Sequence, residues 1–251
     1  MQLIIRKNSA DLAKEAANFV AKRIKDVLKT QDRFTIALSG GSTPKALHEL
    51  LAKSPYAEQI PWLQLHVFWG DERYVPIDDP QNNAGMAYDT LLGHVFTPED
   101  QIHVWRTDLE PDAAAADYDR ILHDYFKESG ESTAPADRPE PTFDLVLLGM
   151  GDDGHTLSLF PGTEVVHEQT AWTKAYFLDQ QHMYRLTLTA PVVNRASCVL
   201  FLVAGPKKAA QLREVLEGDY QPDTYPAQVI KPVSGELIWM VDEKAAADLK
   251  P

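Results

Sequence analysis

The chain has 251 residues, of which 44% are hydrophobic and 24% charged, as expected of a soluble globular protein with a large core. Its net charge of −13 argues against nucleic acid and anionic membrane surfaces as partners, and its single cysteine, Cys198, excludes an internal disulfide framework. Because the N-terminus lacks a signal-peptide layout and no apolar run approaches about 18 residues, we expect a cytoplasmic protein that uses Cys198 for core packing.

Strand and helix signals alternate along the chain. Short apolar runs predict strands at residues 2–6, 34–38, 65–69, 143–149, 185–189, 199–203 and 236–241. Helical spacing of apolar residues predicts helices at 9–29, 43–51, 83–92, 112–126 and 207–216. Ser9 is the expected N-cap of the first helix, and Pro44 the expected first residue of the second. The alternation predicts an α/β fold with a mostly parallel open sheet and helices on both faces.

One segment, residues 129–142, is rich in Pro, Ser, Glu and Ala and is predicted to be a flexible surface loop. A domain hinge is the alternative interpretation. The rest of the chain has no internal repeats. We therefore expect residues 1–251 to form a single domain.

Glycine and hydroxyl residues follow the strand at 34–38, in the order Ser39-Gly40-Gly41-Ser42-Thr43-Pro44. The glycines allow close approach of a ligand to the backbone, and the N–H groups of a helix that begins here favour an anion. The segment is neither a Walker loop, because no Gly-Lys-Ser/Thr follows, nor a nucleophile elbow, because Ala37 replaces the leading glycine. An ordinary turn capped by Thr43 is the alternative.

Charged residues Asp71-Glu72-Arg73 follow the strand at 65–69 and are expected in a second strand-end loop. The guanidinium of Arg73 can bind a phosphate or a developing oxyanion. A surface ion pair between Arg73 and Asp71 or Glu72 is the alternative.

A histidine lies in the turn after the strand at 143–149, which reads Gly149-Met-Gly-Asp-Asp-Gly-His155-Thr-Leu-Ser-Leu-Phe-Pro-Gly162. Its glycines match a dinucleotide fingerprint, but Asp152 and Asp153 would face the pyrophosphate, so we reject NAD. A histidine has an ordinary pKa of about 6.5, so His155 can act as a general base with Asp153 orienting its ring. A histidine tied to backbone carbonyls is the alternative.

Further cations stand near strand ends. Lys207 and Lys208 follow Gly205-Pro206 in the first turn of an expected helix, where they oppose the helix dipole. That conflict favours a functional role for one of them, with solvated lysines as the alternative. Arg185 begins another strand and can complete the local basic cluster that an acidic protein needs around an anion. Since strand carboxyl ends share one edge of a sheet, we expect these loops to form one active site.

The sequence predicts neither a metal nor an organic cofactor. His48-Glu49 begins like a zinc helix motif, but Ala52 stands where the second histidine belongs. The remaining histidines are scattered without the spacing of metal ligands.

The order of these motifs resembles the 6-phosphogluconolactonase family over nearly the whole chain. The resemblance continues through Arg185-Leu-Thr-Leu-Thr and the segments 205–209 and 226–243. Members often carry proline where this chain has Asp152, and frequently arginine where it has Lys231. The resemblance implies hydrolysis of 6-phospho-D-glucono-1,5-lactone to 6-phosphogluconate in the oxidative pentose phosphate pathway. It also implies a sheet related to those of glucosamine-6-phosphate deaminase and ribose-5-phosphate isomerase.

The resemblance also implies roles for individual residues, without a metal or a covalent nucleophile. His155 deprotonates the attacking water, and Asp71 and Asp153 orient sugar hydroxyls or His155. Arg73 binds the phosphate or polarises the lactone carbonyl. The implied phosphate-binding residues come from several loops: Gly40, Gly41, Ser42, Thr43, Arg73, Lys208 and, as a further helper, Arg185. The expected partner is this small sugar-phosphate lactone, and the expected assembly is a monomer or small homo-oligomer.

Two other functions stay open at this point. A related deaminase or isomerase also binds hexose phosphates, but the deaminase typically carries a carboxylate soon after its Gly-His. Here residues 156–162 contain none, and the first later acid is Glu164. A non-catalytic sugar-phosphate sensor is the second, although such a protein needs no base like His155.

Overall fold

Six parallel strands form the main sheet of the computed structural model, which describes residues 1–126 and 141–250. Their order across the sheet is β1 (Gln2–Arg6), β9 (Glu236–Asp242), β8 (Cys198–Val203), β5 (Leu145–Leu148), β2 (Phe34–Leu38) and β3 (Leu65–Trp69). Every residue of β2, β5 and β8 is buried, as expected of parallel strands covered on both faces. The predicted α/β fold with a mostly parallel sheet is confirmed.

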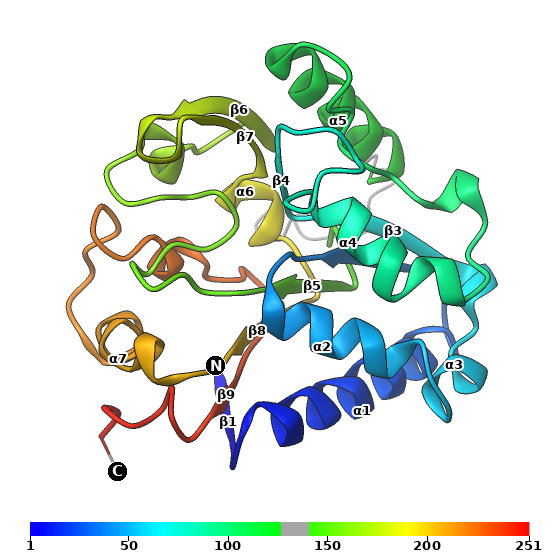
Figure 1. The fold of residues 1–251 in the computed structure, drawn as a ribbon, viewed down its shortest axis with the longest axis horizontal. Coiled ribbons are helices and arrows are strands. Elements are labelled where there is room, and N and C mark those ends of the chain that lie inside the picture. The colour runs from blue at the N-terminus through cyan, green and yellow to red at the C-terminus, as the bar shows by residue number, and fades with distance from the viewer. Residues whose placement is uncertain (127–140, 251) are drawn as a thin grey trace.

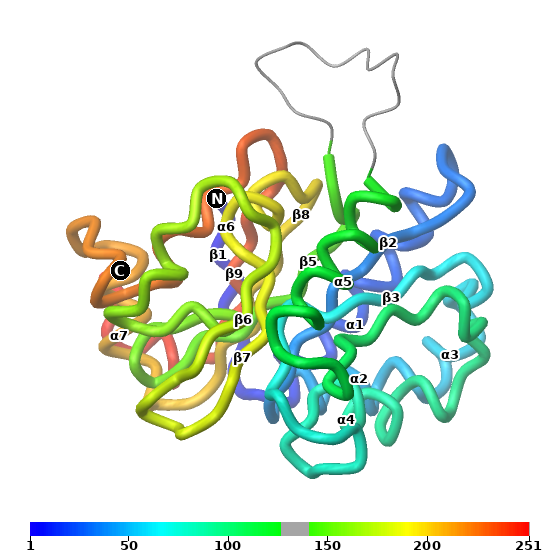
Figure 2. Tube along the Cα trace, turned by 90° about the horizontal axis from the view of Figure 1, so that it is seen from above, coloured from blue at the N-terminus to red at the C-terminus, as the bar shows by residue number. Residues whose placement is uncertain are grey.

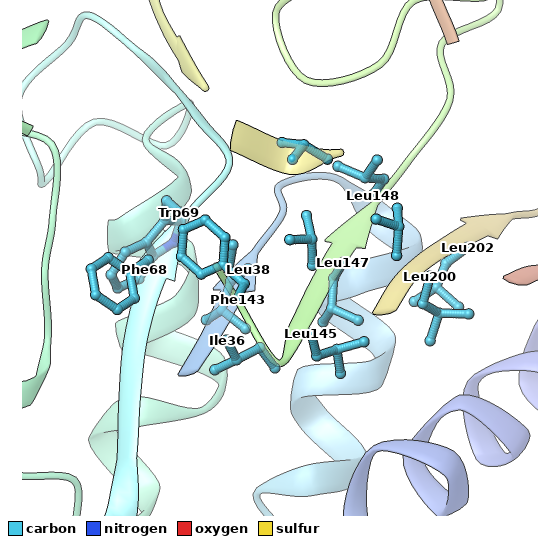
Figure 3. Close-up of a cluster of buried hydrophobic side chains, with 14 of the residues drawn as sticks. Ile36, Leu38, Phe68, Trp69, Phe143, Leu145, Leu147, Leu148, Leu200 and Leu202 are labelled. Carbon is cyan, nitrogen blue, oxygen red and sulfur yellow. The ribbon is translucent and has the colours of Figure 1, made fainter. Parts of the chain in front are cut away.

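Aliphatic and aromatic side chains of the central strands make up the core (Figure 3). Ile36 of β2 lies in register with Val67 of β3 and Leu145 of β5, and Leu147 pairs with Leu200 of β8. Full burial of one such side chain stabilises the fold by about 1.5–3 kcal/mol. Cys198, at the start of β8, is fully buried, which confirms its predicted packing role.

Helices cover both faces of this sheet (Figure 1). Helix α1 (Ser9–Val27) packs against α2 (Ser42–Leu51), α3 (Tyr56–Gln59) and β9 on one side. On the other side, α5 (Pro111–Tyr125) presents Tyr118, whose hydroxyl accepts the Trp69 N–H of β3 at 2.9 Å. The remaining helices are shorter: α4 (Asn83–Thr90), α6 (Ala190–Val193) and α7 (Ala209–Glu217). Figure 2 shows α7 on the β1 side of the molecule and α4 on the β3 side.

A second sheet of three antiparallel strands, β4 (Asp71–Arg73), β7 (Met183–Leu188) and β6 (Thr173–Leu178), was not predicted. The prediction of a loop at Asp71–Arg73 is therefore wrong, and the strand expected at 185–189 pairs here rather than in the main sheet. The chain passes from β3 to β4 at Gly70, whose N–H donates to Leu38 and whose carbonyl accepts from Leu188. Two tertiary partners, rather than local sequence, thus make these residues a strand.

Several predicted boundaries also shift. Asn8, not Ser9, is the N-cap of α1, because its side chain accepts the Asp11 N–H at 2.9 Å. Helix α2 begins at Ser42, ahead of Pro44, and a 3-10 turn at Pro206–Lys208 precedes α7. The loop predicted at 129–142 falls almost entirely outside the described residues. Within the residues that are described, no helix has the length and apolarity to cross a membrane.

Buried His48 on α2 predicts a loss of stability in mild acid. Burial lowers the pKa of His48 to about 4, whereas an unfolded histidine titrates near its ordinary value of about 6.5. As the pH falls from 7.5 to 5, the unfolded chain gains a proton that the folded chain does not accept. We expect this residue to lower the free energy of unfolding by roughly 2 kcal/mol over that range.

Urea unfolding at the two pH values measures this effect. The variant His48→Leu should show a correspondingly smaller decrease, while the exposed-histidine control His94→Leu should keep the wild-type dependence. An unchanged decrease in His48→Leu would contradict the prediction.

Candidate active site

Segments that follow four neighbouring strands meet in one open cleft of about 220 Å³. The strands are β8, β5, β2 and β3, and the cleft lies beyond their carboxyl ends, where open α/β sheets bind ligands. We call it the strand-end cleft and define it by its lining residues: Ser39, Gly40, Gly41, Asp71, Arg73, Asn83, Gly149, Met150, Gly151, His155, Thr156, Leu157 and Lys208.

His155 has a fixed ring orientation. Its Nδ1 lies 2.5 Å from Oδ1 of Asp153, and its ring stacks on Phe160 with centroids 4.0 Å apart. Burial raises the pKa of Asp153, but hydrogen bonding and the charge of His155 outweigh it and leave that pKa below its ordinary value. An ionised Asp153 that accepts a hydrogen bond from Nδ1–H leaves Nε2 as the basic nitrogen of the ring.

The turn around His155 requires a glycine at position 151 and a left-handed backbone conformation at Leu157. A Cβ on Gly151 would come within 2.1 Å of His155 Nδ1, so no larger residue fits beside the ring. Leu157, which lines the strand-end cleft, has φ of +53°, an uncommon conformation for a leucine. The Thr156 hydroxyl donates to the Gly149 carbonyl at 2.8 Å and closes the turn. Such backbone strain is typical of functional loops.

The glycine loop after β2 leads directly into α2. Gly41 has φ of +99° and is the N-cap residue, and no side chain caps the helix there. The first N–H groups of α2 are therefore open to an anion. Gly40 contacts Asn83 so closely that an added Cβ would lie 1.9 Å from Asn83 Oδ1. Gly40 and Gly41 line the strand-end cleft, whereas Ser42 and Thr43 lie beside it in the first turn of α2.

Residues of β4 form the opposite wall. Asp71 is buried, and its Oδ2 accepts the Ser158 hydroxyl at 2.7 Å. Arg73 donates to the Gln81 carbonyl at 2.8 Å, and its Nε is buried without a hydrogen-bond partner among the described residues. No ion pair joins Arg73 to Asp71 or Glu72 in the described part of the chain, so that alternative interpretation of the motif is wrong.

Glu72 instead ties β4 to α4. Its buried carboxylate accepts backbone N–H groups from Arg73, Asn83 and Ala84 at 2.7–2.9 Å. Burial raises the pKa of Glu72 to about 7, against the opposing effect of these hydrogen bonds. Glu72 thereby holds Asn83, whose amide donates to the Asp71 carbonyl at 2.9 Å, against the strand-end cleft.

Two further predicted cations have different surroundings. Lys208 lines the strand-end cleft, and its Nζ lies 2.5 Å from Oδ1 of Asp152. Arg185 is 4% exposed, donates to Gln181 and lies over the Phe160 ring, 5.4 Å from its centroid. Burial, the largest influence, lowers the pKa of Arg185. Arg185 stands opposite Arg73 in the β4–β7 register, next to the wall rather than in the lining.

The structure thus brings most of the predicted residues to one place. Six line the strand-end cleft: Gly40, Gly41, Asp71, Arg73, His155 and Lys208. Ser42, Thr43, Asp153 and Arg185 lie directly behind or beside these. Sequence reasoning missed Asn83 and Phe160. Asn82, directly before the helix expected at 83–92, is an N-cap signal, but no sequence signal indicates that Asn83 faces Gly40.

The chain is similar to known proteins along most of its length. A model of the family of glucosamine-6-phosphate isomerases and 6-phosphogluconolactonases matches residues 7–239. A 6-phosphogluconolactonase of Synechocystis sp. is 42% identical over 97% of this chain and 96% of its own length.

Solved structures show the same fold. A 6-phosphogluconolactonase of Trypanosoma cruzi superimposes with a TM-score of 0.85 at 27% identity, covering 100% of this chain and 97% of its own. A monomeric glucosamine-6-phosphate deaminase superimposes with a TM-score of 0.82 at 20% identity, covering 99% and 100% of the two chains. The latter likeness shows the fold alone.

Proposed function

This chain belongs to the family of glucosamine-6-phosphate isomerases and 6-phosphogluconolactonases, and we propose how its strand-end cleft hydrolyses 6-phospho-D-glucono-1,5-lactone. The observation that carries the proposal is the His155–Asp153 pair, with Nδ1 and Oδ1 2.5 Å apart, in a cleft that also holds Arg73 and Lys208. A base and two cations suit an ester that carries a phosphate.

His155 is the general base of this reaction. Its Nε2 takes a proton from water, and the water oxygen attacks the lactone carbonyl carbon. The tetrahedral intermediate then collapses, the bond to the ring oxygen breaks, and that oxygen takes the proton from His155. The carboxylic acid that forms releases its remaining proton to solvent and becomes a carboxylate. Asp153 accepts a hydrogen bond from Nδ1–H throughout and stabilises the imidazolium that forms between the two steps. A lactone is electrophilic enough to need no covalent nucleophile.

The phosphate of the substrate binds among the cations and the open end of α2. The uncapped N–H groups after Gly41 face the anion, and Lys208 and Arg73 supply positive charge beside it. Arg185, which is opposite Arg73 in the β4–β7 register, adds positive electrostatic potential without contacting the phosphate. Asp71, held by Ser158, is placed to orient a sugar hydroxyl.

The position of Glu164 favours a lactonase over a deaminase. It is the first acid after His155, and a deaminase would need such a carboxylate close to its reacting atoms. Glu164 lies in a 3-10 helix, Glu164–His167, and lines a separate cavity together with Lys174 and Tyr176. Among the described residues, the carboxylate that would follow the histidine in a deaminase therefore lies outside the strand-end cleft.

Acid release from freshly generated lactone tests the proposal. After subtraction of spontaneous hydrolysis, we expect turnover that survives exhaustive chelation, because His155 and Asp153 supply the base. In the described residues no three His, Cys, Asp or Glu side chains gather as metal ligands would. Ammonia release from glucosamine 6-phosphate would indicate a deaminase. Binding of a sugar phosphate without turnover would indicate a non-catalytic sensor. Activity lost on chelation and restored by zinc or magnesium would contradict the metal-free mechanism.

A cytoplasmic location and a monomeric or small homo-oligomeric state stay predictions. Cell fractionation tests the first of these, and sedimentation of the purified protein tests the second.

A further inference from the structure

Lys208 is paired within the protein at the place where the substrate anion would bind. Its Nζ lies 2.5 Å from Oδ1 of Asp152, and the two side chains are 22% and 56% exposed. Lys208 and His155 line the same cleft, and Asp152 lies on the His155 turn, three residues before the histidine. An anion that binds Lys208 must therefore displace the Asp152 carboxylate from Lys208 or share Lys208 with it.

The two neighbouring aspartates of this turn have separate partners. Asp153 contacts His155 through both the ring Nδ1, at 2.5 Å, and the backbone N–H, at 3.1 Å. Asp152 contacts Lys208, which lies in the segment after β8, the strand next to β5 in the sheet. Only the first pair takes part in the proposed proton transfer, so the second calls for another explanation.

We propose that Asp152 is an internal counter-ion that lowers the affinity of the strand-end cleft for anions. The inference rests on the proposed function, because the anion in question is the phosphate of the lactone. When the cleft is empty, the Asp152 carboxylate neutralises Lys208. When a phosphate dianion enters, Asp152 gives up its cation and repels the incoming charge across a partly exposed site. Asp152 thus sets the substrate affinity without contacting the reacting atoms.

Hydrolysis makes the same carboxylate useful for product release. The lactone ring is neutral, whereas the product carries a new carboxylate in addition to its phosphate. The product is therefore more anionic than the substrate and is repelled more strongly by Asp152 than the substrate is. A site with Lys208 unpaired would hold both anions more tightly and the product most of all.

The variant Asp152→Asn tests the inference, because it keeps the size of the side chain and removes its charge. We expect KM for the lactone and the inhibition constant of inorganic phosphate to fall together by about two- to tenfold. The inhibition constant of 6-phosphogluconate should fall at least as much. These gains should shrink at high salt and largely disappear in a Lys208→Ala background.

Asp32→Asn is the matched control, because it removes one exposed negative charge two residues before β2, at the opposite end of the strand from the cleft. It should leave all these constants unchanged. Phosphate binding that is unchanged or weaker in Asp152→Asn would overturn the inference. Calorimetry with inorganic phosphate gives this answer without turnover, so absence of lactone hydrolysis by the wild type would contradict only the proposed function.

Discussion

Replacing His155 with alanine is expected to lower kcat by roughly 10²–10⁴-fold while KM for the lactone changes little. The imidazole takes and returns a proton, so its loss raises the barrier of the chemical step. The phosphate contacts, which come from the segments after β2 and β8 and from β4, stay in place. Stopped-flow or pH-stat measurement of acid release, corrected for spontaneous hydrolysis, gives both constants.

The chain provides a close control for this substitution. His167 pairs with Asp223, Nε2 to Oδ1 at 2.6 Å, much as His155 pairs with Asp153, but it lines a different cavity. We expect His167→Ala to retain wild-type kcat. A folded His155→Ala protein with near-normal turnover would refute the assignment of His155 as the base.

Replacing Lys208 or Arg73 with alanine is expected to weaken substrate binding roughly ten- to a hundredfold. A charged hydrogen bond contributes about 1.5–3 kcal/mol, which corresponds to this range in a dissociation constant. Inorganic phosphate and sulfate should compete with the lactone in the wild type, and both substitutions should relieve that competition. Steady-state inhibition and calorimetric titration with inorganic phosphate measure these effects.

Lys207→Ala is the matched control, because Lys207 is the exposed neighbour of Lys208 and does not line the strand-end cleft. Its substrate affinity should equal that of the wild type. If Arg73→Ala lowers kcat and leaves KM and phosphate inhibition unchanged, Arg73 acts on the lactone carbonyl and not on the phosphate. Unaltered phosphate inhibition in Lys208→Ala would show that another residue binds the phosphate.

The affinity of the strand-end cleft for anions depends on the charges closest to it. The chain carries a net charge of −13, yet two cations from different segments, Arg73 and Lys208, line a single small cleft. At physiological salt, charges farther away than about 8 Å are largely screened, so Lys208 and Arg73 outweigh the distant acidic surface. Asp152 is close enough to oppose them, which is why its removal is expected to change affinity.

Local sequence determined the parts of this protein that depend on periodicity and turn chemistry. The apolar runs that became β2, β3, β5 and β8 were recognisable because strands buried on both faces have continuous apolar sequence. The three strand-end motifs could be placed at one edge because parallel strands share the direction of their carboxyl ends. From these, His155, Arg73 and Lys208 were predicted to lie close together.

Only the tertiary structure decided how the walls of the cleft are built. Asp71–Arg73 has no strand periodicity, and it becomes β4 because β7, more than a hundred residues later, pairs with it. Asn83 faces Gly40 because Glu72, buried by this pairing, binds the first N–H groups of α4. Asp152 meets Lys208 because β5 and β8 are neighbours in the sheet. Each contact joins residues far apart in the chain, so its energy depends on the assembled fold and leaves no trace in local sequence.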